Sequence, residues 1–394
     1  MRRRTKALLA IALLLLAALL FVRLYLPGHV DASRNPVTPH DPYPVSEDAR
    51  ALHSTLTIGD WHADSLLWNR DLTARASHGH VDFPRLREGN VALQVFTTVT
   101  KSPAGQNYEA NSADAADNIT LLAVASGWPA RTWGDLTERA LYQAEKLDGF
   151  VKAEGQGARL VRETADLDAV LKARAEGRDT LGVLLGIEGA HALEGDLKNL
   201  DRLEAAGFRV IGLHHFFDNA LGTSLHGQSE GGLTEFGREV VHAVAERGMV
   251  LDLAHSSPAV AMEVVEMTDM PLLVSHTGLH SHCEVTRNFP DPVMLAIAET
   301  GGTIGMGYWS DVICSGDTPT DVARMIAAAV QILGEDHVSL GSDYDGSVGT
   351  GFDASELPAL THALLEEGLT ETQIAKVMGG NMLRVLRARL STRG

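Results

Sequence analysis

The chain has 394 residues, 45% of them hydrophobic, which is enough to bury a large core. Its formal net charge is −18, and residues 1–26 contribute five basic side chains and no acid, so the remainder carries −23. Such an acidic body is a poor partner for nucleic acid or for an anionic lipid surface, and we expect neither.

The amino terminus resembles a membrane-targeting segment. Basic residues within the first six positions precede an uncharged run from Ala7 to Val22. The positive-inside rule keeps the basic end cytoplasmic and sends the remainder across the membrane, to the periplasmic or extracellular side. The run is close to the ~20 residues that span a bilayer, and no clear cleavage site follows it. We expect residues 1–26 to be a signal anchor; because Arg23 interrupts the apolar stretch, a cleaved signal peptide, which would leave a secreted protein, is the alternative.

Residues 27–48 are rich in Pro, Asp and Ser and have no apolar periodicity, which predicts an extended linker. A single domain is expected over residues 49–394. Cys283 and Cys314 either form a disulfide, which an exported protein permits, or are buried separately, and the sequence leaves both possibilities open.

Short apolar runs rich in β-forming residues alternate with longer amphipathic segments such as Gly237–Arg247 and Asp321–Leu333. This alternation predicts an α/β fold with a parallel sheet. Eight runs favour a (β/α)₈ TIM barrel of the metallo-dependent hydrolase type, with an open doubly wound sheet as the alternative. Residues 98–180 are expected to hold extra helices, and the segment after Gly349 to be helical and to pack outside the barrel. The eight runs are Leu56–Gly59, Val91–Thr97, Leu181–Ile187, Arg209–His214, Met249–Leu253, Pro271–Ser275, Gly302–Tyr308 and Val338–Ser342.

Histidines and carboxylates follow most of these strands. His62 and Asp64 are two residues apart, so in an extended strand both side chains point the same way. Because all strands of a parallel barrel end on the same face, where active sites lie, the joint pattern predicts a metal site. The other candidates at strand ends are Glu188, His191, His214, His215, Asp252, His255, His276, Asp343 and Asp345.

The donor types indicate which metal is bound. Imidazole and carboxylate without thiolate favour zinc, with other divalent transition metals possible. The strand ends supply no lysine, so Glu188 is the candidate for a bridge between two ions. His62, Asp64, Glu188, His255 and His276 are too many ligands for one open catalytic zinc, and they predict two zinc ions per chain.

A site with two zinc ions indicates that the protein is a hydrolase. A water between them loses its proton near neutral pH, and the hydroxide attacks a polarised carbonyl. Asp343, after the eighth run, is the expected general acid and base, and His215 is expected to stabilise the oxyanion.

At this point the sequence resembles the renal or membrane dipeptidase family over most of the chain after residue 56. Nine stretches in family order carry the resemblance: D-W-H-A-D, V-D-F-P-R-L-R-E-G-N-V-A-L-Q-V-F, G-I-E-G-A-H-A-L, G-L-T-E-F-G-R-E-V-V, L-D-L-A-H-S-S, V-S-H-T, T-R-N, L-G-S-D-Y-D-G and G-G-N-M-L-R-V-L.

The resemblance implies a two-zinc barrel that hydrolyses dipeptides. It assigns His62 and Asp64 to one zinc, His255 and His276 to the other, and Glu188 to the bridge. It also implies that His215 contacts the substrate, that Asp343 is the acid and base, and that Arg287 of T-R-N binds the substrate carboxylate. A bidentate guanidinium suits that task. Family members often pair, so a homodimer is a further expectation.

Some positions depart from the family pattern. Trp61 stands where a small residue is usual, and His214 stands where many members have a threonine, so a register shift of one would exchange His214 and His215. Phe216 and Phe217 replace small polar residues, which leaves the substrate side chain open. The chain ends without the apolar tail of a glycolipid anchor, so we expect the amino-terminal segment to tether it. Two alternatives remain: a two-zinc hydrolase of lactones, phosphoesters or β-lactams, and a non-catalytic domain stabilised by metal.

Overall fold

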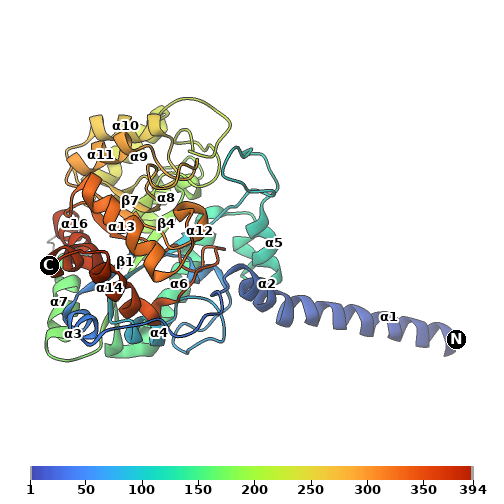
Figure 1. The fold of residues 1–394 in the computed structure, drawn as a ribbon. Helices are drawn as coiled ribbons and strands as arrows, with labels where there is room; N and C mark the ends of the chain where they lie inside the picture. Colours follow the sequence, from blue (N-terminus) through green and yellow to red (C-terminus); the bar gives the residue numbers. More distant parts are fainter. Residues whose placement is uncertain (1, 392–394) are drawn as a thin grey trace.

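A closed parallel β-barrel lies at the centre of the computed structural model, which describes residues 2–391 (Figure 1). Met1 and residues 392–394, at the ends of the predicted ranges, lie outside the described part. The strands pair in chain order, and β2 closes the ring by pairing with β4 from Leu93 opposite Gly182 to Val99 opposite Glu188. The barrel strands are β1 (Ile58–Ala63), β2 (Val91–Val99), β4 (Leu181–Glu188), β5 (Phe208–Gly212), β6 (Val250–Asp252), β7 (Leu273–Thr277), β8 (Thr303–Met306) and β9 (Val338–Leu340).

Helices follow every barrel strand and cover the outside of the barrel, which confirms the predicted (β/α)₈ architecture and rules out an open sheet. They are α4 (Phe83–Glu88), α5 (Asn118–Ala125), α6 (Leu136–Glu154), α7 (Thr164–Ala175), α8 (Lys198–Ala206), α9 (Glu235–Glu246), α10 (Pro258–Met267), α11 (Asp291–Glu299), α12 (Ser310–Ile313), α13 (Pro319–Leu333) and α14 (Leu357–Glu366).

All eight predicted strands are present, with shifted ends. The first begins later than predicted and extends to Ala63, so that His62 lies inside β1. Residues 98–180 hold α5, α6 and α7, as expected, and also a short strand, β3 (Ala158–Leu160), which pairs with the start of β4. The final segment is helical. Its α14 packs against α13, while α16 (Asn381–Arg389), which follows α15 (Glu371–Ala375), contacts β1, β6, β8 and β9 near the amino end of the barrel.

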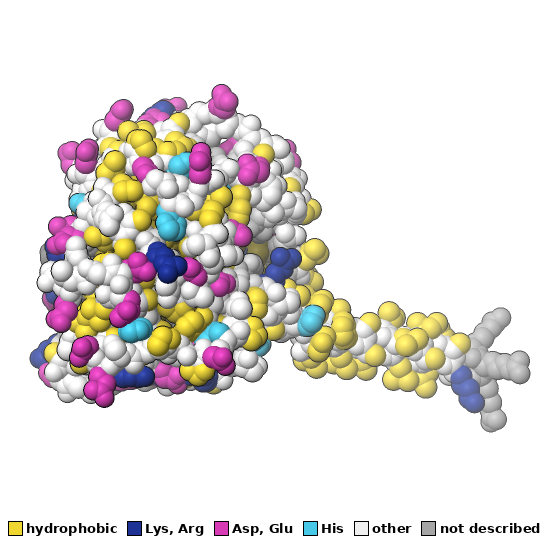
Figure 2. Space-filling view, in the orientation of Figure 1, with side chains coloured by type: hydrophobic (Ala, Val, Ile, Leu, Met, Phe, Trp, Pro, Cys, Tyr) yellow, Lys and Arg dark blue, Asp and Glu magenta, His cyan; other side chains and the backbone are white. Residues whose placement is uncertain are grey.

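A long amino-terminal helix projects from the barrel (Figure 1) and presents a mostly apolar surface (Figure 2). It consists of α1 (Arg2–Leu20), the π-helical turn Phe21–Tyr25 and α2 (Leu26–Arg34). Residues Thr5–Arg34 are long and apolar enough to cross a membrane, with a mean hydropathy of 2.8 in the most apolar window and none of that window buried.

The prediction of an extended linker from residue 27 is wrong for its first part, because α2 continues to Arg34. Pro27 lies in the first turn of this helix, where a proline does not break the hydrogen-bonding pattern. Asp31 and Asn35 are buried against the barrel, and this tertiary contact stabilises a segment whose composition alone suggests a linker. The chain is then irregular up to α3 (Glu47–Thr55), which Ser46 caps.

Cys283 and Cys314 form a disulfide, with 5.5 Å between their Cα atoms. The bond joins the segment after β7 to the end of α12, so it links two loops on the face where the strands end. This pairing was one of the two possibilities that the sequence left open.

Candidate metal centre

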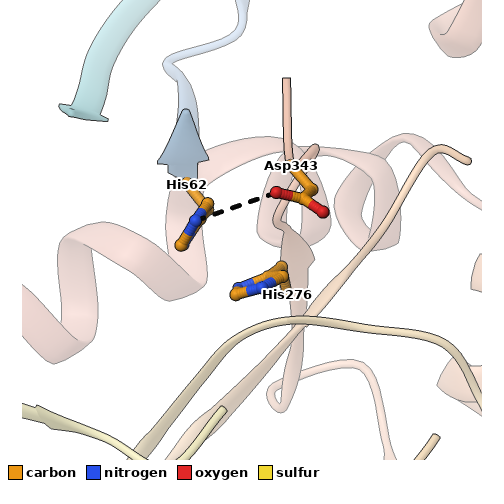
Figure 3. Close-up of side chains that lie close together, drawn as sticks. All are labelled: His62, His276 and Asp343. Atoms are coloured by element: carbon orange, nitrogen blue, oxygen red, sulfur yellow. Dashed lines mark ion pairs between the residues drawn. The ribbon is translucent and has the colours of Figure 1, made fainter. Parts of the chain in front are cut away.

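The carboxyl ends of the barrel strands bring the predicted ligands together. His62 is in β1, with Asp64 directly after it, Glu188 ends β4, and His276 is in β7. His215, His255 and Asp343 lie in the loops after β5, β6 and β9. Figure 3 shows His62 and His276, from two strands, and Asp343, from the loop after β9, converging on one space, with His62 Nε2 3.8 Å from Asp343 Oδ1.

Glu188 lies at the centre of the cluster and is buried. Its Oε1 atom is 3.5 Å from His62 Nε2, 3.2 Å from His255 Nε2 and 3.3 Å from His276 Nε2. Its Oε2 atom is 3.3 Å from His215 Nε2. One carboxylate therefore lies within 3.5 Å of four imidazoles, which is compatible with a ligand shared between two ions.

Three sets of ligand atoms lie close enough together to hold an ion, within 4.8 Å of one another. They are His62, Asp64 and Glu188; Glu188, His215 and His255; and His62, His276 and Asp343. The first two sets share Glu188, so the geometry is compatible with two neighbouring ions.

Hydrogen bonds outside the cluster orient its members. Thr97 Oγ1 donates to Asp64 Oδ1 at 2.5 Å, the oxygen that lies 3.6 Å from His62 Nε2, and so fixes the orientation of this carboxylate. His215 Nδ1 lies 3.2 Å from the carbonyl oxygen of Lys101, which can only accept, so this nitrogen carries the hydrogen. Its Nε2 atom is therefore the one that faces Glu188.

The carboxylates of the cluster repel one another in a buried space. Burial, together with Asp64, raises the pKa of Glu188 well above its usual range. Burial and Asp64 also raise the pKa of Asp343 to about 7. Burial opposes the charge on His62, but the attraction of Glu188 and Asp64 is larger and raises its pKa to about 10. Such a concentration of negative charge attracts cations.

At the other three histidines of the cluster the pKa is lowered rather than raised. Burial lowers the pKa of His215 to about 4, and burial together with Arg287 lowers the pKa of His255 well below its usual value. Burial and the neighbouring His62 do the same to His276. These rings are neutral at pH 7, which is the form that binds a metal.

The donor set fits a divalent transition metal. It combines neutral imidazoles with carboxylates, and the Nε2 atom of His62 is buried without a hydrogen-bond partner. Two members also have unusual backbone conformations, with a φ of 62° at His255 and 57° at Asp343. Residues other than glycine adopt this left-handed region at a cost, and such positions are concentrated at functional sites.

Arg287 lies beside the cluster and is buried. Its Nη2 atom donates to the carbonyl oxygen of His276 at 2.8 Å, and its guanidinium lies over the Trp309 ring at 5.6 Å from the ring centre. The Nη1 atom is buried without a hydrogen-bond partner. An unpaired buried donor of this kind is costly unless a ligand accepts its hydrogen bond.

Four strand-end candidates lie outside the cluster. Asp252 Oδ2 accepts a hydrogen bond from Ser275 Oγ at 2.6 Å. His191 Nε2 is 2.9 Å from Thr100 Oγ1, and His214 Nδ1 is 3.0 Å from Ser256 Oγ. Asp345 pairs with Arg70 at 2.7 Å. His215, rather than the adjacent His214, therefore faces Glu188. Trp61 belongs to a fully buried hydrophobic group that includes Leu93 and Met382, so its bulk is accommodated in the core.

Tyr108 and His226 are not among the residues predicted from the sequence. The His226 ring stacks on Phe216, with 4.8 Å between ring centres, and the Tyr108 hydroxyl accepts a hydrogen bond from Trp309 Nε1 at 3.0 Å. Both residues lie in long irregular loops after β2 and β5, where no periodic pattern or motif marks them. Phe216 also contacts the rings of His215 and His255.

A (β/α)₈ barrel that gathers buried imidazoles and carboxylates at its strand ends is the architecture of a metal-dependent hydrolase. The sequence model of the membrane dipeptidase family, peptidase family M19, matches residues 46–393, and the chain belongs to this family. It is therefore a metallo-dipeptidase of the (β/α)₈ type, a metal-dependent enzyme that acts on dipeptides.

Individual relatives agree with this assignment. Dipeptidase aclJ of Aspergillus oryzae is 29% identical over 355 residues, which cover 84% of this chain and 77% of that protein. The crystal structure of dipeptidase AC, a metallopeptidase of the same family, is 25% identical with a TM-score of 0.72, covering 85% of this chain and 99% of that one. A metallopeptidase of Rhodobacter sphaeroides, solved with a phosphinate mimic of the dipeptide L-Ala-D-Ala, has the same fold, with a TM-score of 0.69 and 24% identity over 85% of this chain and 99% of that one.

Proposed function

We propose that this dipeptidase uses two zinc ions, one held by His62 and Asp64 and the other by His255 and His276, with Glu188 shared between them. The position of Glu188, within 3.5 Å of three histidine Nε2 atoms, carries this proposal. When bound, such a pair of ions acts as a Lewis acid toward the peptide carbonyl and lowers the pKa of water in the site.

Asp343 is the proposed general acid and base. Its carboxyl is buried at the cluster, and burial together with Asp64 raises its pKa to about 7, close to the value that suits proton transfer in both directions near neutrality. In this role it takes a proton from the attacking water and delivers that proton to the amine that leaves.

His215 is the proposed donor to the substrate oxygen. Burial lowers its pKa to about 4, so the ring is neutral. A neutral ring could have its hydrogen on either nitrogen, and in the present structure Nδ1 faces the Lys101 carbonyl oxygen. Donation from Nε2 to a developing oxyanion therefore requires the ring either to shift its proton or to turn when substrate binds.

Arg287 is the proposed binding residue for the carboxylate at the substrate's free carboxyl terminus. Its Nη2 atom is already paired with the His276 carbonyl oxygen, and its Nη1 atom is buried and unpaired. A carboxylate would satisfy this donor and would neutralise a buried charge. A buried cation beside the metal cluster favours a substrate with a free carboxylate, such as a dipeptide, over a neutral ester or lactone.

The test uses the full chain in detergent. Metal analysis should find about two zinc per chain, and a panel of dipeptides with L and D residues at each position should include substrates. Asp343→Asn should lower kcat by about a thousandfold or more while the zinc content stays unchanged. Asp269→Asn, which changes an exposed aspartate in the segment before β7, at the amino end of the barrel, is the matched control. Zinc-loaded protein that cleaves no dipeptide would contradict the assignment, and an active Asp343→Asn variant would contradict the role of Asp343.

We further propose that the active domain lies on the exported side of a membrane and that the apolar part of the amino-terminal helix, before Pro27, anchors it there. The exposed apolar surface of this helix and the disulfide between Cys283 and Cys314, a bond typical of oxidising compartments, support the proposal. The full chain should remain in the membrane fraction after alkaline carbonate extraction and retain its amino terminus. Release of a shortened chain would indicate a cleaved signal peptide. Association into a homodimer remains an expectation that analytical ultracentrifugation in detergent can test.

A further inference from the structure

The loop after β9, residues 341–350 and here called the β9 loop, has an unusual backbone. Three of its residues other than glycine have a positive φ: 57° at Asp343, 64° at Asp345 and 65° at Ser347. A side chain at Gly346 would place its Cβ 2.1 Å from Asp343 Oδ1, so this glycine leaves the space that the Asp343 carboxylate occupies. A loop in such a conformation persists only where its surroundings hold it.

Asp345 is the main attachment point of the β9 loop, and it is completely buried. Its Oδ1 atom accepts from the His80 backbone N–H at 2.8 Å. Its Oδ2 atom accepts from Ser65 Oγ at 2.5 Å and pairs with Arg70 Nη2 at 2.7 Å. Of these three partners Arg70 alone carries a full charge, so it balances the buried carboxylate.

The second partner of Arg70 comes from the amino-terminal helix. Arg70 Nε lies 2.9 Å from Asp31 Oδ2 of α2, and both side chains are buried. Asn35 adds a direct link, because its Nδ2 donates to Asp31 Oδ1 at 2.8 Å and its Oδ1 accepts from the Ser347 backbone N–H at 2.9 Å. The helix is thus linked to the β9 loop by ion pairs through Arg70 and by hydrogen bonds through Asn35.

The residues just after α2 continue this contact. The Pro36 carbonyl oxygen accepts from the Thr350 N–H at 3.1 Å, and the Thr38 N–H donates to the Thr350 carbonyl oxygen at 2.8 Å. At its other end the β9 loop reaches the cluster, because the Tyr344 carbonyl oxygen accepts from the Asp64 N–H at 2.9 Å. The loop therefore connects the amino-terminal helix to the backbone of a proposed metal ligand and to the carboxylate of Asp343.

We propose that Asp31 and Asn35 are positioning residues for dipeptide hydrolysis, which hold the β9 loop so that Asp343 faces the substrate. The inference rests on the proposed role of Asp343. Both residues precede the region that the family model matches, residues 46–393. In this chain the helix that continues from the proposed membrane anchor is therefore also a part of the active site's support.

The experiment compares three variants of the full chain in detergent with the unaltered protein. Asp31→Asn removes the charge that faces Arg70, and Asn35→Ala removes the bond to Ser347. Asp41→Asn removes one negative charge from an exposed position of the same segment and is the matched control. Amide hydrogen exchange is followed over residues 343–350, and kcat and KM are measured on a dipeptide at a temperature at which all variants stay folded.

We expect Asp31→Asn and Asn35→Ala to increase exchange in the β9 loop by about tenfold or more and to lower kcat by about tenfold to a hundredfold, as misplacement of a catalytic group does. KM should change less than about twofold, because Arg287 lies outside this loop. Unchanged exchange in both variants would overturn the proposal, and so would faster exchange with an unchanged kcat. If Asp31→Asn does not fold, Asn35→Ala tests the proposal alone, because this substitution removes no charge.

A failure of the proposed function would give a different experimental result. An unaltered chain that is loaded with metal yet cleaves no dipeptide would contradict the dipeptide assignment. The exchange comparison does not depend on a substrate, so it would still show whether α2 holds the β9 loop.

Discussion

The hydroxyl of Ser275 donates a hydrogen bond of 2.6 Å to Asp252 Oδ2, and the direction of this bond requires a hydrogen on the Nδ1 atom of two neighbouring histidines. Ser275 Oγ also lies 2.8 Å from His276 Nδ1 and 3.2 Å from His62 Nδ1. Because a hydroxyl has a single hydrogen, both rings must donate to it from Nδ1. Their Nε2 atoms are then directed toward Glu188 and are available to a metal.

Replacing Ser275 tests this arrangement. Ser275→Ala should weaken metal binding by about tenfold to a hundredfold, since it removes the acceptor that orients both imidazoles. Metal affinity is measured by competition with a chelator. Ser281→Ala, at an exposed position nearby, is the control and should bind metal as the unaltered chain does. Equal affinities for the two variants would mean that packing alone orients the rings.

Substitutions of Arg287 test how the substrate is recognised. Arg287→Ala should lower kcat/KM for a dipeptide by about tenfold to a hundredfold, the range expected for loss of a hydrogen-bonded charge pair. Arg287→Lys should recover only part of this loss, because an ammonium group cannot bind a carboxylate in a bidentate manner. The same dipeptide with an amidated carboxyl terminus serves as the control substrate. If both substrates lost activity equally, Arg287 would act on the cluster rather than on the carboxylate.

The pKa of His62 predicts how the stability of the metal-stripped chain depends on pH. Although burial opposes its charge, Glu188 and Asp64 raise its pKa from 6.5 to about 10 in the folded chain. The folded state therefore holds a proton that the unfolded state releases, and this contribution is complete below pH 6.5 and lost as pH rises through 10. The free energy of unfolding should therefore differ less between the unaltered chain and His62→Gln at pH 10 than at pH 7.

Urea unfolding of the chelator-treated proteins at both pH values measures this difference. His242→Gln, which changes an exposed histidine on α9, is the control. Other buried groups also titrate in this range, so the comparison between variants, rather than the stability of one protein, carries the result. A difference that stays constant with pH would show that His62 is not charged in the metal-stripped chain.

The barrel and the cluster could be predicted because both follow from local pattern and from one rule of topology. Continuous apolar runs indicate buried parallel strands, and the carboxyl ends of such strands meet on one face. His62, Glu188 and His276 therefore had to lie close together once the strands were identified. The choice between His214 and His215 depended on a single residue of register, and the structure resolved it by placing His215 beside Glu188.

The contacts between segments far apart in the chain could not be predicted. Asp31 pairs with Arg70, and Asn35 accepts a hydrogen bond from Ser347, which is 312 residues away. No local pattern marks these contacts, and the composition of residues 27–48 suggested a linker. Tyr108 and His226 lie in irregular loops, where side-chain periodicity carries no information. The conformation of the β9 loop depends on left-handed backbone at Asp343, Asp345 and Ser347, which residue type alone does not indicate.

The disulfide between Cys283 and Cys314 should contribute measurably to stability. The two cysteines are 31 residues apart, and closing a loop of this length lowers the entropy of the unfolded chain by the equivalent of about 3 to 4 kcal/mol. Reduction should lower the free energy of urea unfolding by an amount of this order. The double variant Cys283→Ala with Cys314→Ala should start from the lower value and should not respond to reductant. If reduction left the stability of the unaltered chain unchanged, the closely packed loops after β7 and β8 would retain the same contacts without the bond.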